Sequence, residues 1–329
     1  MRAFEHTSVT SAEEALADLN AHRDGEARLI AGGTDLLTLM KADLVAPARL
    51  IDLKPLTHLR GIKRQPDGSF QIGALTTLAQ IERDAEIVSA CPMLIQAIQD
   101  AATPQLRAMA TIGGNLLQQY RCWYYRDGLN CWLAGGDECF AREGQNQYHA
   151  IFQQGPCVAA HLSDLAPALI ALDATVTMQG QSGERETPVA ELLAAPTGNR
   201  RVSHTLGQGE IITRITIPAP SPGARGVYLK AMDRQAWSFA LASVAARLTL
   251  EGDTIREARV VLGGVANTPW RAREAEAALI GQPITSELAA QAAALAVQDA
   301  TPLTLNGYKV HLARELTRRA ILLTAGREP

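Results

Sequence analysis

Four cysteines in the middle of the chain are the residues whose type and spacing point most directly to chemistry. Cys122, Cys131, Cys139 and Cys157 are separated by eight, seven and seventeen residues. Residues 120–152 also hold eight of the fifteen aromatic side chains. Because thiolates that bind an inorganic centre need a dry shell to hold and tune it, this composition predicts a shielded metal site.

Three kinds of site compete for these thiols. Zinc sites usually take cysteines in closely spaced pairs, and the chain has no C-x-x-C. Disulfides need an oxidising compartment, and the N-terminus lacks the apolar core of an export signal. A cubane 4Fe-4S cluster tolerates wide and irregular ligand spacing. The sequence therefore favours a 4Fe-4S cluster ligated by Cys122, Cys131, Cys139 and Cys157.

Three further residues of ligand type are weaker candidates. His149 and His161 lie near the cysteines and can substitute as ligands, although a histidine in such a segment is more often on the surface or beside the ligands. Cys91 precedes Pro92 in an apolar stretch, and a free cysteine behaves as a small hydrophobic residue. We therefore expect Cys91 to be buried and structural.

Two Gly-Gly turns lie about eighty residues apart. Gly32-Gly33 follows a short apolar run, Gly113-Gly114 follows Thr111-Ile112, and each pattern predicts a strand, a tight turn and a helix. Consecutive glycines let backbone N–H groups form an anion-binding nest, so the two turns can face each other across one pyrophosphate. A plain turn is the alternative for each. Neither matches the G-x-G-x-x-G fingerprint or the phosphate loop, which disfavours a Rossmann fold or a nucleotide hydrolase.

Short strands and helices must position these residues. Ser11-Ala12-Glu13-Glu14 is a capping box that predicts a helix to about Leu19. Asp164 can cap a helix through Leu172, and Ser221-Pro222-Gly223 is typical of a linker between two domains. Further strands are expected at 50–52, 61–63, 70–73, 175–178, 210–217 and 256–262, further helices at 76–83, 92–102, 268–281, 286–300 and 306–325, and either type at 226–232 and 238–250.

The overall composition narrows the class of protein. Apolar residues make up 47% and charged residues 20% of the 329 residues, as in ordinary soluble globular proteins. The net charge of −3 leaves no basic patch to assign to nucleic acid. No run of eighteen apolar residues occurs, so we expect no membrane insertion.

Several stretches together resemble the FAD-binding medium subunit of the molybdenum hydroxylases, the xanthine dehydrogenase family. The likeness covers essentially the whole chain and includes three signature loops and three landmarks of the C-terminal domain. The loops are Ala31-Gly32-Gly33-Thr34-Asp35, Thr111-Ile112-Gly113-Gly114-Asn115 and Ser163-Asp164-Leu165-Ala166-Pro167. The landmarks are Tyr228-Leu229-Lys230-Ala231-Met232-Asp233-Arg234, Leu262-Gly263-Gly264-Val265-Ala266 and Asn306-Gly307-Tyr308-Lys309.

The resemblance implies an α+β fold in two domains. Residues 1–220 would form a two-part FAD-binding domain of the vanillyl-alcohol-oxidase (PCMH) type, with the 4Fe-4S insert at about 119–160. Residues 224–329 would form a small α+β C-terminal domain of the CO dehydrogenase flavoprotein type. The insert is similar to those of two branches, the periplasmic aldehyde oxidoreductase flavoprotein subunit and the 4-hydroxybenzoyl-CoA reductase β subunit. Arg121-Cys122-x-Tyr124-Tyr125 and the distant Cys157 are closer to the aldehyde oxidoreductase branch.

The resemblance also assigns the residues that contact FAD. Backbone amides of the two glycine loops would bind the pyrophosphate, Asp164 would hold the polar edge of the flavin, and Lys230 would lie near the isoalloxazine. A helix cap is the alternative for Asp164, and a solvated strand lysine is the alternative for Lys230. The full set is Leu29, Ile30, Ala31, Gly32, Gly33, Thr34, Asp35, Leu36, Thr111, Gly114, Asn115, Asp164 and Lys230.

The implied function is that of an oxidoreductase subunit. This chain would be the FAD- and 4Fe-4S-containing electron-transfer subunit of a heterotrimeric molybdenum-dependent aldehyde oxidoreductase. Substrate would be oxidised at a molybdenum cofactor on a large partner subunit, and electrons would cross 2Fe-2S centres on a small partner before FAD passed them to an external acceptor. No residue of this chain would then be catalytic toward the substrate.

Three other functions stay open from the sequence: the medium subunit of a 4-hydroxybenzoyl-CoA reductase-like enzyme, a stand-alone flavin oxidase, and a non-enzymatic iron–sulfur scaffold. An oxidase needs a general base and a substrate pocket, and no His-Asp or paired-carboxylate arrangement has convincing spacing for one. The expected location is cytoplasmic, or periplasmic by export together with a signal-bearing partner.

Overall fold

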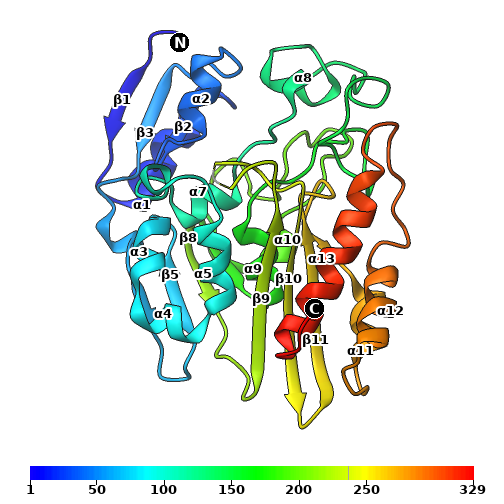
Figure 1. Ribbon diagram of the computed structural model, residues 1–329. Helices are drawn as coiled ribbons and strands as arrows, with labels where there is room; N and C mark the ends of the chain where they lie inside the picture. Colours follow the sequence, from blue (N-terminus) through cyan, green and yellow to red (C-terminus); the bar gives the residue numbers. More distant parts are fainter. Residues whose placement is uncertain (236) are drawn as a thin grey trace.

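The N-terminal part of the chain forms a three-stranded parallel sheet. The structure, a computed structural model, describes residues 1–235 and 237–329. The sheet has the order β1-β3-β2 and consists of β1 (Glu5–Ser8), β2 (Ala27–Ile30) and β3 (Arg49–Asp52). Helices α1 (Ala12–Asn20) and α2 (Leu36–Lys41) connect its strands, and the unit is the blue part of Figure 1.

Helix α1 begins at the predicted residue. Ser11 Oγ accepts a hydrogen bond from the Glu14 N–H at 3.1 Å, which satisfies one of the free amides of the first turn. The Glu14 carboxylate turns back to the Thr10 N–H, at 2.7 Å, rather than to Ser11. The predicted start is confirmed, and the helix ends at Asn20, one residue beyond the predicted end.

The second sheet has five strands in the order β4-β5-β8-β6-β7, and its neighbours all pair antiparallel. The strands are β4 (Ile62–Arg64), β5 (Phe70–Gly73), β6 (Thr175–Gly180), β7 (Gly183–Pro188) and β8 (Glu210–Ile217). Strand β8 has the predicted bounds. The chain leaves this sheet after β5 and returns at β6. Several short helices lie in between, together with the segment that carries the four clustered cysteines, residues 117–164, which we call the cysteine segment.

Short helices connect the sheets. They are η1 (Thr57–Leu59), α3 (Leu78–Arg83), α4 (Ala85–Ala90), α5 (Pro92–Gln99), α6 (Pro104–Arg107), α7 (Ile112–Leu116), α9 (Leu165–Ala171) and α10 (Val189–Leu192). Apolar residues of α5 and α9 share one core with the second sheet and with Tyr228 and Val261 of the third. The two helices therefore form the layer between these sheets. Cys91 is buried in the same core, as predicted.

The third sheet is antiparallel, in the order β12-β11-β10-β9. Its strands are β9 (Ala224–Ala231), β10 (Ala242–Glu251), β11 (Thr254–Gly263) and β12 (Trp270–Arg271), and its helices are α11 (Arg273–Leu279), α12 (Ser286–Ala296) and α13 (Tyr308–Thr324). Side chains of β10 alternate: Ala245 joins the core with α5 and α9, while Val244 and Ala246 join the core with α13. Figure 1 shows α13, in red, lying across this sheet.

The predicted helix from Thr268 begins later than expected. Trp270 and Arg271 pair with Leu262 and Val261 as strand β12, and α11 starts only at Arg273. Pairing with β11 outweighs the helix-start signal of Thr268-Pro269, because a sheet edge offers these residues backbone partners that the local sequence does not reveal.

The cysteine segment has little regular structure. Within residues 117–164 it contains only the one-turn helices α8 (Trp123–Arg126) and η2 (Trp132–Ala134), and it lies at the top of the view in Figure 1. The segment rests on the loop after β11: Tyr120 Oη donates to the Asn267 carbonyl at 2.7 Å, and Asn267 Nδ2 donates to the Cys157 and Ala159 carbonyls. Across the described residues, no helix has the length and apolar character needed to cross a bilayer.

Candidate functional site

The two glycine loops face one large cavity of about 540 Å³. The first loop joins β2 to α2, and the second enters α7. Ten of the thirteen residues predicted to contact FAD line this cavity: Leu29, Ile30, Ala31, Gly32, Gly33, Thr34, Asp35, Leu36, Thr111 and Gly114. The predicted juxtaposition of the two loops is therefore present, although they are far apart in the sequence.

Both glycines of the first loop are required by its geometry. Gly33 has a φ of +71°, a conformation that other residues adopt at a cost. A Cβ on Gly32 would lie 2.0 Å from the Met109 carbonyl oxygen, so only glycine permits the first loop to approach the segment that leads to the second. At the second loop, Thr111 Oγ1 accepts the Gly114 N–H at 3.2 Å and fixes the turn into α7. The N–H groups of residues 112–115 all donate to acceptors within the protein, so the prediction that amides of this loop bind the pyrophosphate is not confirmed.

The polar groups at the cavity fit a diphosphate. Within the described part of the chain, the backbone N–H groups of residues 32–35 donate to no backbone carbonyl, so they are free to bind an anion. Arg23, Arg28 and Arg201 add positive charge to the lining. His204 also lines the cavity, and its buried Nδ1 has no hydrogen-bond partner among the described residues. These groups can hold the phosphates and polar edges of FAD.

Asp35 connects the first loop to the cysteine segment. Its Oδ2 accepts the Gln119 N–H at 2.7 Å, and its Oδ1 lies 2.6 Å from Arg121 Nη1 and 2.9 Å from Arg126 Nη2. Arg121 and Arg126 flank the first cysteine, so one carboxylate fixes the position of the cysteine segment relative to the loop. A role for Asp35 in the loop was expected from the sequence. This connection was not, because its partners are more than eighty residues away.

Three of the predicted FAD contacts do not line the cavity. Lys230 Nζ lies 3.0 Å from Asp164 Oδ2 and donates to the Asp100 carbonyl at 2.8 Å, and Tyr228 Oη donates to Asp164 Oδ1 at 2.7 Å. The Lys230 side chain is fully buried, so the interpretation as a solvated strand lysine is wrong. Asn115 accepts the Ser163 hydroxyl at 2.5 Å.

Asp164 does not cap α9 with its side chain. It occupies the N-cap position, but Ser163 Oγ instead accepts the Ala166 N–H, at 3.1 Å. Burial raises the pKa of Asp164, and the neighbouring Lys230 and Tyr228 oppose that rise. The predicted helix is present, and the cap is provided by the residue before the predicted one.

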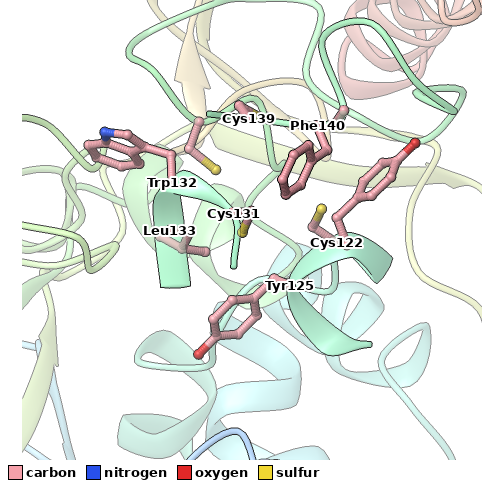
Figure 2. Close-up of a pocket in the computed structure, with 10 residues that line it drawn as sticks. Cys122, Tyr125, Cys131, Trp132, Leu133, Cys139 and Phe140 are labelled. Atoms are coloured by element: carbon pink, nitrogen blue, oxygen red, sulfur yellow. The ribbon is translucent and has the colours of Figure 1, made fainter. Parts of the chain in front are cut away.

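The four clustered cysteines line a single small cavity. Figure 2 shows the sulfurs of Cys122, Cys131 and Cys139 directed toward one space, and Cys157 also lines it. The other lining residues are Tyr124, Tyr125, Trp132, Leu133, Phe140 and Ala141. Cys131 and Cys157 are buried, Cys122 and Cys139 are half-buried, and all five cysteines of the chain are free thiols. The predicted gathering of four thiols inside a shell of aromatic and apolar side chains is thus present.

The environment of the thiols separates their pKa values. A hydrogen bond with the Cys157 thiol lowers the pKa of Cys139 to about 6, and the same contact with burial raises the pKa of Cys157. Burial raises the pKa of Cys122 to about 11. Among the residues that the structure describes, no three His, Cys, Asp or Glu side chains are arranged to hold a single metal ion. The space between the sulfurs is small, about 10 Å³.

His149 contacts one of these thiols. Its Nε2 lies 3.2 Å from Cys122 Sγ, and the side chain is buried. Burial lowers the pKa of His149 to about 4. His161 is also buried, and neither ring nitrogen has a partner in the described structure. Both histidines are therefore buried rather than on the surface. Only His149, of the two, lies within hydrogen-bond distance of a cysteine sulfur.

Two residues that sequence analysis did not assign to the flavin cavity contact both sites. Tyr125 lines the large cavity and the cysteine cavity. Arg201 lines the large cavity, donates to the Gly136 carbonyl at 2.8 Å, and lies over the Trp132 ring with its guanidinium 4.8 Å from the ring centre. The motif around Cys122 contains Tyr125, but nothing in the sequence indicates that this ring faces two cavities.

Comparison with known proteins gives matches over nearly the whole chain. Residues 2–220 match the family described as FAD binding domain in molybdopterin dehydrogenase, and residues 227–324 match CO dehydrogenase flavoprotein C-terminal domain. The aldehyde oxidoreductase FAD-binding subunit PaoB of Escherichia coli (strain K12) is 37% identical over 286 residues, covering 85% of this chain and 86% of the relative.

Carbon monoxide dehydrogenase provides a match in sequence and in structure. The medium chain of the Hydrogenophaga pseudoflava enzyme is 27% identical over 323 residues, covering 97% of this chain and 96% of the relative. A solved structure of carbon monoxide dehydrogenase from that organism superposes with a TM-score of 0.80 at 26% identity, covering 100% of this chain and 99% of that one.

These matches confirm the expected α+β fold, in which an FAD-binding domain is followed by a C-terminal domain of the CO dehydrogenase flavoprotein type. They also support FAD as cofactor and a role as a subunit of an oxidoreductase. The chain therefore belongs to the FAD-binding medium subunits of the molybdenum hydroxylase family.

Proposed function

We propose that this chain is the FAD- and 4Fe-4S-containing electron-transfer subunit of a heterotrimeric, molybdenum-dependent aldehyde oxidoreductase. Its partners would be a large subunit that carries the molybdenum cofactor and a small subunit that carries 2Fe-2S centres. Electrons would leave through this chain to an external acceptor. The proposed substrate class follows the relative that is 37% identical, which is named an aldehyde oxidoreductase subunit.

The observation that carries this proposal is the ring of Tyr125, which lines both cavities. The flavin cavity and the cysteine cavity are therefore neighbours, with one aromatic side chain between them. Burial raises the pKa of Tyr125, which keeps its phenol protonated. A flavin and an iron–sulfur cluster held in these two cavities would be close enough for the chain to pass electrons between them.

FAD is supported by the free amides and basic side chains around the large cavity. Bound there, the flavin would supply chemistry in which electrons are exchanged singly or in pairs. The residues of this chain would bind and orient it: the amides of residues 32–35 would hold the diphosphate, and Arg28 and Arg201 would balance its negative charge.

The 4Fe-4S cluster is supported by the cysteine arrangement alone, because the matching family descriptions name FAD and no iron–sulfur group. Four thiols line one space, and they are not arranged as the ligands of a single ion among the described residues. In a cubane each thiolate binds a different iron, which suits such a set better than zinc does. The surrounding Trp132, Leu133 and Phe140 would keep water away from the cluster.

Anaerobic purification followed by a visible spectrum and by iron and sulfide assays tests the cofactors. We expect flavin bands together with about four irons per chain. Flavin without iron would overturn the cluster and favour a stand-alone oxidase, while iron without flavin would favour a non-enzymatic scaffold. Reduction of the purified complex by aldehydes tests the substrate class. A complex that aldehydes do not reduce, and that an aromatic acyl-CoA thioester reoxidises after chemical reduction, would instead indicate a 4-hydroxybenzoyl-CoA reductase-like enzyme.

We further propose that the chain folds in the cytoplasm, and that it either stays there or reaches the periplasm by export together with a signal-bearing partner subunit. The free state of the described cysteines suits a compartment that keeps thiols reduced. Fractionation of the native host, with the partner subunits followed in parallel, distinguishes the two locations. Recovery of this chain with the membrane fraction after a high-salt wash would contradict both.

A further inference from the structure

The imidazole of His149 contacts the Cys122 sulfur and packs against two aromatic side chains. The imidazole Nε2 lies 3.2 Å from Cys122 Sγ, within hydrogen-bond reach for a sulfur acceptor. The ring packs edge-on against Trp123, with ring centres 5.3 Å apart, and next to Tyr124 at 6.3 Å. Its Nδ1 has no partner among the described residues. The position of this ring is therefore set by packing and by the backbone that carries it.

That backbone is held by the C-terminal domain. Asn306 Nδ2 donates to the carbonyls of His149, at 3.2 Å, and of Ala150, at 3.0 Å. Lys309 Nζ donates to the carbonyls of Tyr148, at 3.2 Å, and of His149, at 2.9 Å. Lys309 lies in the first turn of α13, and Asn306 lies two residues before this helix begins. The segment that carries His149 is thus fixed by side chains more than 150 residues away.

Lys309 is unusual in its surroundings. It is fully buried, and its third donor bond goes to the Gly264 carbonyl at 2.7 Å. Three carbonyl acceptors match the three N–H donors of a protonated amine. Burial lowers the pKa of Lys309 to about 7. No carboxylate lies within ion-pair distance of it in the described chain, so backbone dipoles alone stabilise this charge. Burying a lysine amine costs desolvation free energy, and two of its three acceptors are carbonyls of the cysteine segment. This arrangement indicates that the position of the segment is important for the protein.

We infer that His149 donates a hydrogen bond from Nε2 to the Cys122 thiolate when that sulfur ligates the cluster, and that Lys309 and Asn306 hold His149 in position to do so. The C-terminal domain would thereby help to set the reduction potential of the cluster. This inference rests on the proposed function, because it requires an iron–sulfur cluster at the four cysteines. His149 is a tuning residue, and Lys309 and Asn306 are positioning residues.

The direction of the effect follows from charge. Reduction adds an electron to the cluster and its thiolates, and a hydrogen bond to a ligand sulfur stabilises the more negative state. Loss of the donor should therefore lower the reduction potential. We expect about a tenfold change in the ratio of reduced to oxidised cluster at a fixed potential, which is about 59 mV for a one-electron couple.

The test is a redox titration of the anaerobically purified full chain, with the cluster followed by electron paramagnetic resonance. His149→Phe removes the donor and keeps an aromatic ring in the packed site, whereas His149→Gln returns an N–H donor. We expect full iron content in both, a lower potential in His149→Phe, and recovery in His149→Gln. His161→Phe is the control, because it removes another buried imidazole whose ring nitrogens have no hydrogen-bond partner among the described residues. This variant should leave the potential unchanged.

The outcomes separate this inference from the proposed function. Wild-type protein with flavin and no iron would contradict the cluster itself. A wild-type cluster whose potential is the same in His149→Phe would overturn the tuning role while leaving the proposed function intact. Loss of iron in His149→Phe would also overturn it, because His149 would then be required for assembly of the site rather than for its potential.

The positioning role needs a second pair of variants. Lys309→Met removes the three donor bonds and keeps the length of the side chain. If Lys309 acts through His149, its variant lowers the potential, and the double variant with His149→Phe is no lower than His149→Phe alone. A further drop in the double variant would show that the charge of Lys309 acts directly and would overturn the role of positioning. If Lys309→Met does not fold, Asn306→Ala carries the same comparison, because it removes the other two bonds to the segment.

Discussion

At the scale of single residues, the site depends on four sulfurs that come from irregular backbone. Cys122 and Cys131 precede one-turn helices, and Cys139 and Cys157 lie in loops. Loops of this kind are positioned by their side chains and by neighbouring domains, because they have no ladder of backbone hydrogen bonds. Each thiol should therefore be separately necessary for the cluster and unnecessary for FAD.

Replacing Cys131 or Cys139 with serine tests this expectation. We expect iron to fall from about four to below one per chain, because a cubane that loses one thiolate is poorly held. FAD should stay largely bound, since neither cysteine lines the large cavity. Cys91→Ser is the matched control, because Cys91 is buried in another core. Full iron content in both cluster variants would show that these thiols are not the ligands.

A second prediction at this scale concerns His161 and acid pH. Burial lowers the pKa of His161 to about 4, from an ordinary value of 6.5. The folded chain keeps this imidazole neutral, whereas the unfolded chain binds a proton below pH 6.5. Above pH 6.5, proton binding to His161 therefore does not affect the free energy of unfolding. As the pH falls toward 4, the free energy of unfolding decreases by up to about 3 kcal/mol because only the unfolded chain binds this proton.

Urea unfolding of the flavin-loaded chain at several pH values measures this loss. His161→Phe should flatten the fall in the free energy of unfolding between pH 6.5 and 4, since phenylalanine cannot take up the proton. A slope equal to that of the wild type would mean that other groups cause the acid sensitivity.

At the scale of elements, the sequence predicted regular structure well where the signal was local. Ser11 caps α1, and β8 runs from Glu210 to Ile217 as its alternating pattern indicates. The prediction failed where a distant partner decided the outcome. Trp270 pairs with β11 instead of starting a helix, and Asp164 gives its oxygens to Tyr228 and Lys230 instead of to α9.

The candidate site was predictable to a similar extent. Glycine pairs and clustered cysteines carry their chemistry in residue type and spacing, so both cavities could be anticipated from the sequence. The links between them could not. Asp35 meets Arg121 and Arg126, and His149 is held by Lys309, through contacts over long sequence separations that no local pattern records.

The first glycine loop gives the prediction that belongs to this scale. Gly33→Val should reduce bound FAD at least tenfold, because valine disfavours the φ of +71° by about 1–2 kcal/mol and its side chain would crowd Leu37 and Ile30. Flavin is measured by absorbance after release from the purified protein. Gly252, in the turn between β10 and β11, has a φ of +59°, and a Cβ added there would meet nothing within 4 Å. Gly252→Val therefore introduces similar backbone strain away from the cavity. Equal flavin loss in both variants would show that general destabilisation, not the loop, is responsible.

At the scale of the whole molecule, the cysteine segment joins the two domains. Its Ile151 N–H donates to the Val265 carbonyl at 2.7 Å, and Phe152 stacks on Trp270 with ring centres 4.1 Å apart and planes 9° from parallel. Phe152 is 2% exposed and belongs to the core of the C-terminal domain. A segment of the first domain thus completes the core of the second.

Phe152→Ala should therefore destabilise the entire chain and not only the segment. We expect a loss of about 3 kcal/mol in the free energy of unfolding, the usual cost of removing a buried phenylalanine ring. Denaturant unfolding followed by far-ultraviolet circular dichroism and by flavin fluorescence provides the measurement. The two signals should shift together, whereas Phe4→Ala, at a side chain that is 37% exposed, should shift neither. Separate transitions for the two signals would show that the domains unfold independently.

The carboxylate of Asp35 has a consequence for attempts to shorten this protein. Excision of the cysteine segment would remove both guanidinium partners and the amide that now surround that carboxylate. A negative charge would then remain without compensation beside the proposed position of the diphosphate, and like charges repel. A trimmed chain should recover its flavin only when position 35 is made neutral in the same step, so the deletion and the point substitution have to be engineered as a pair.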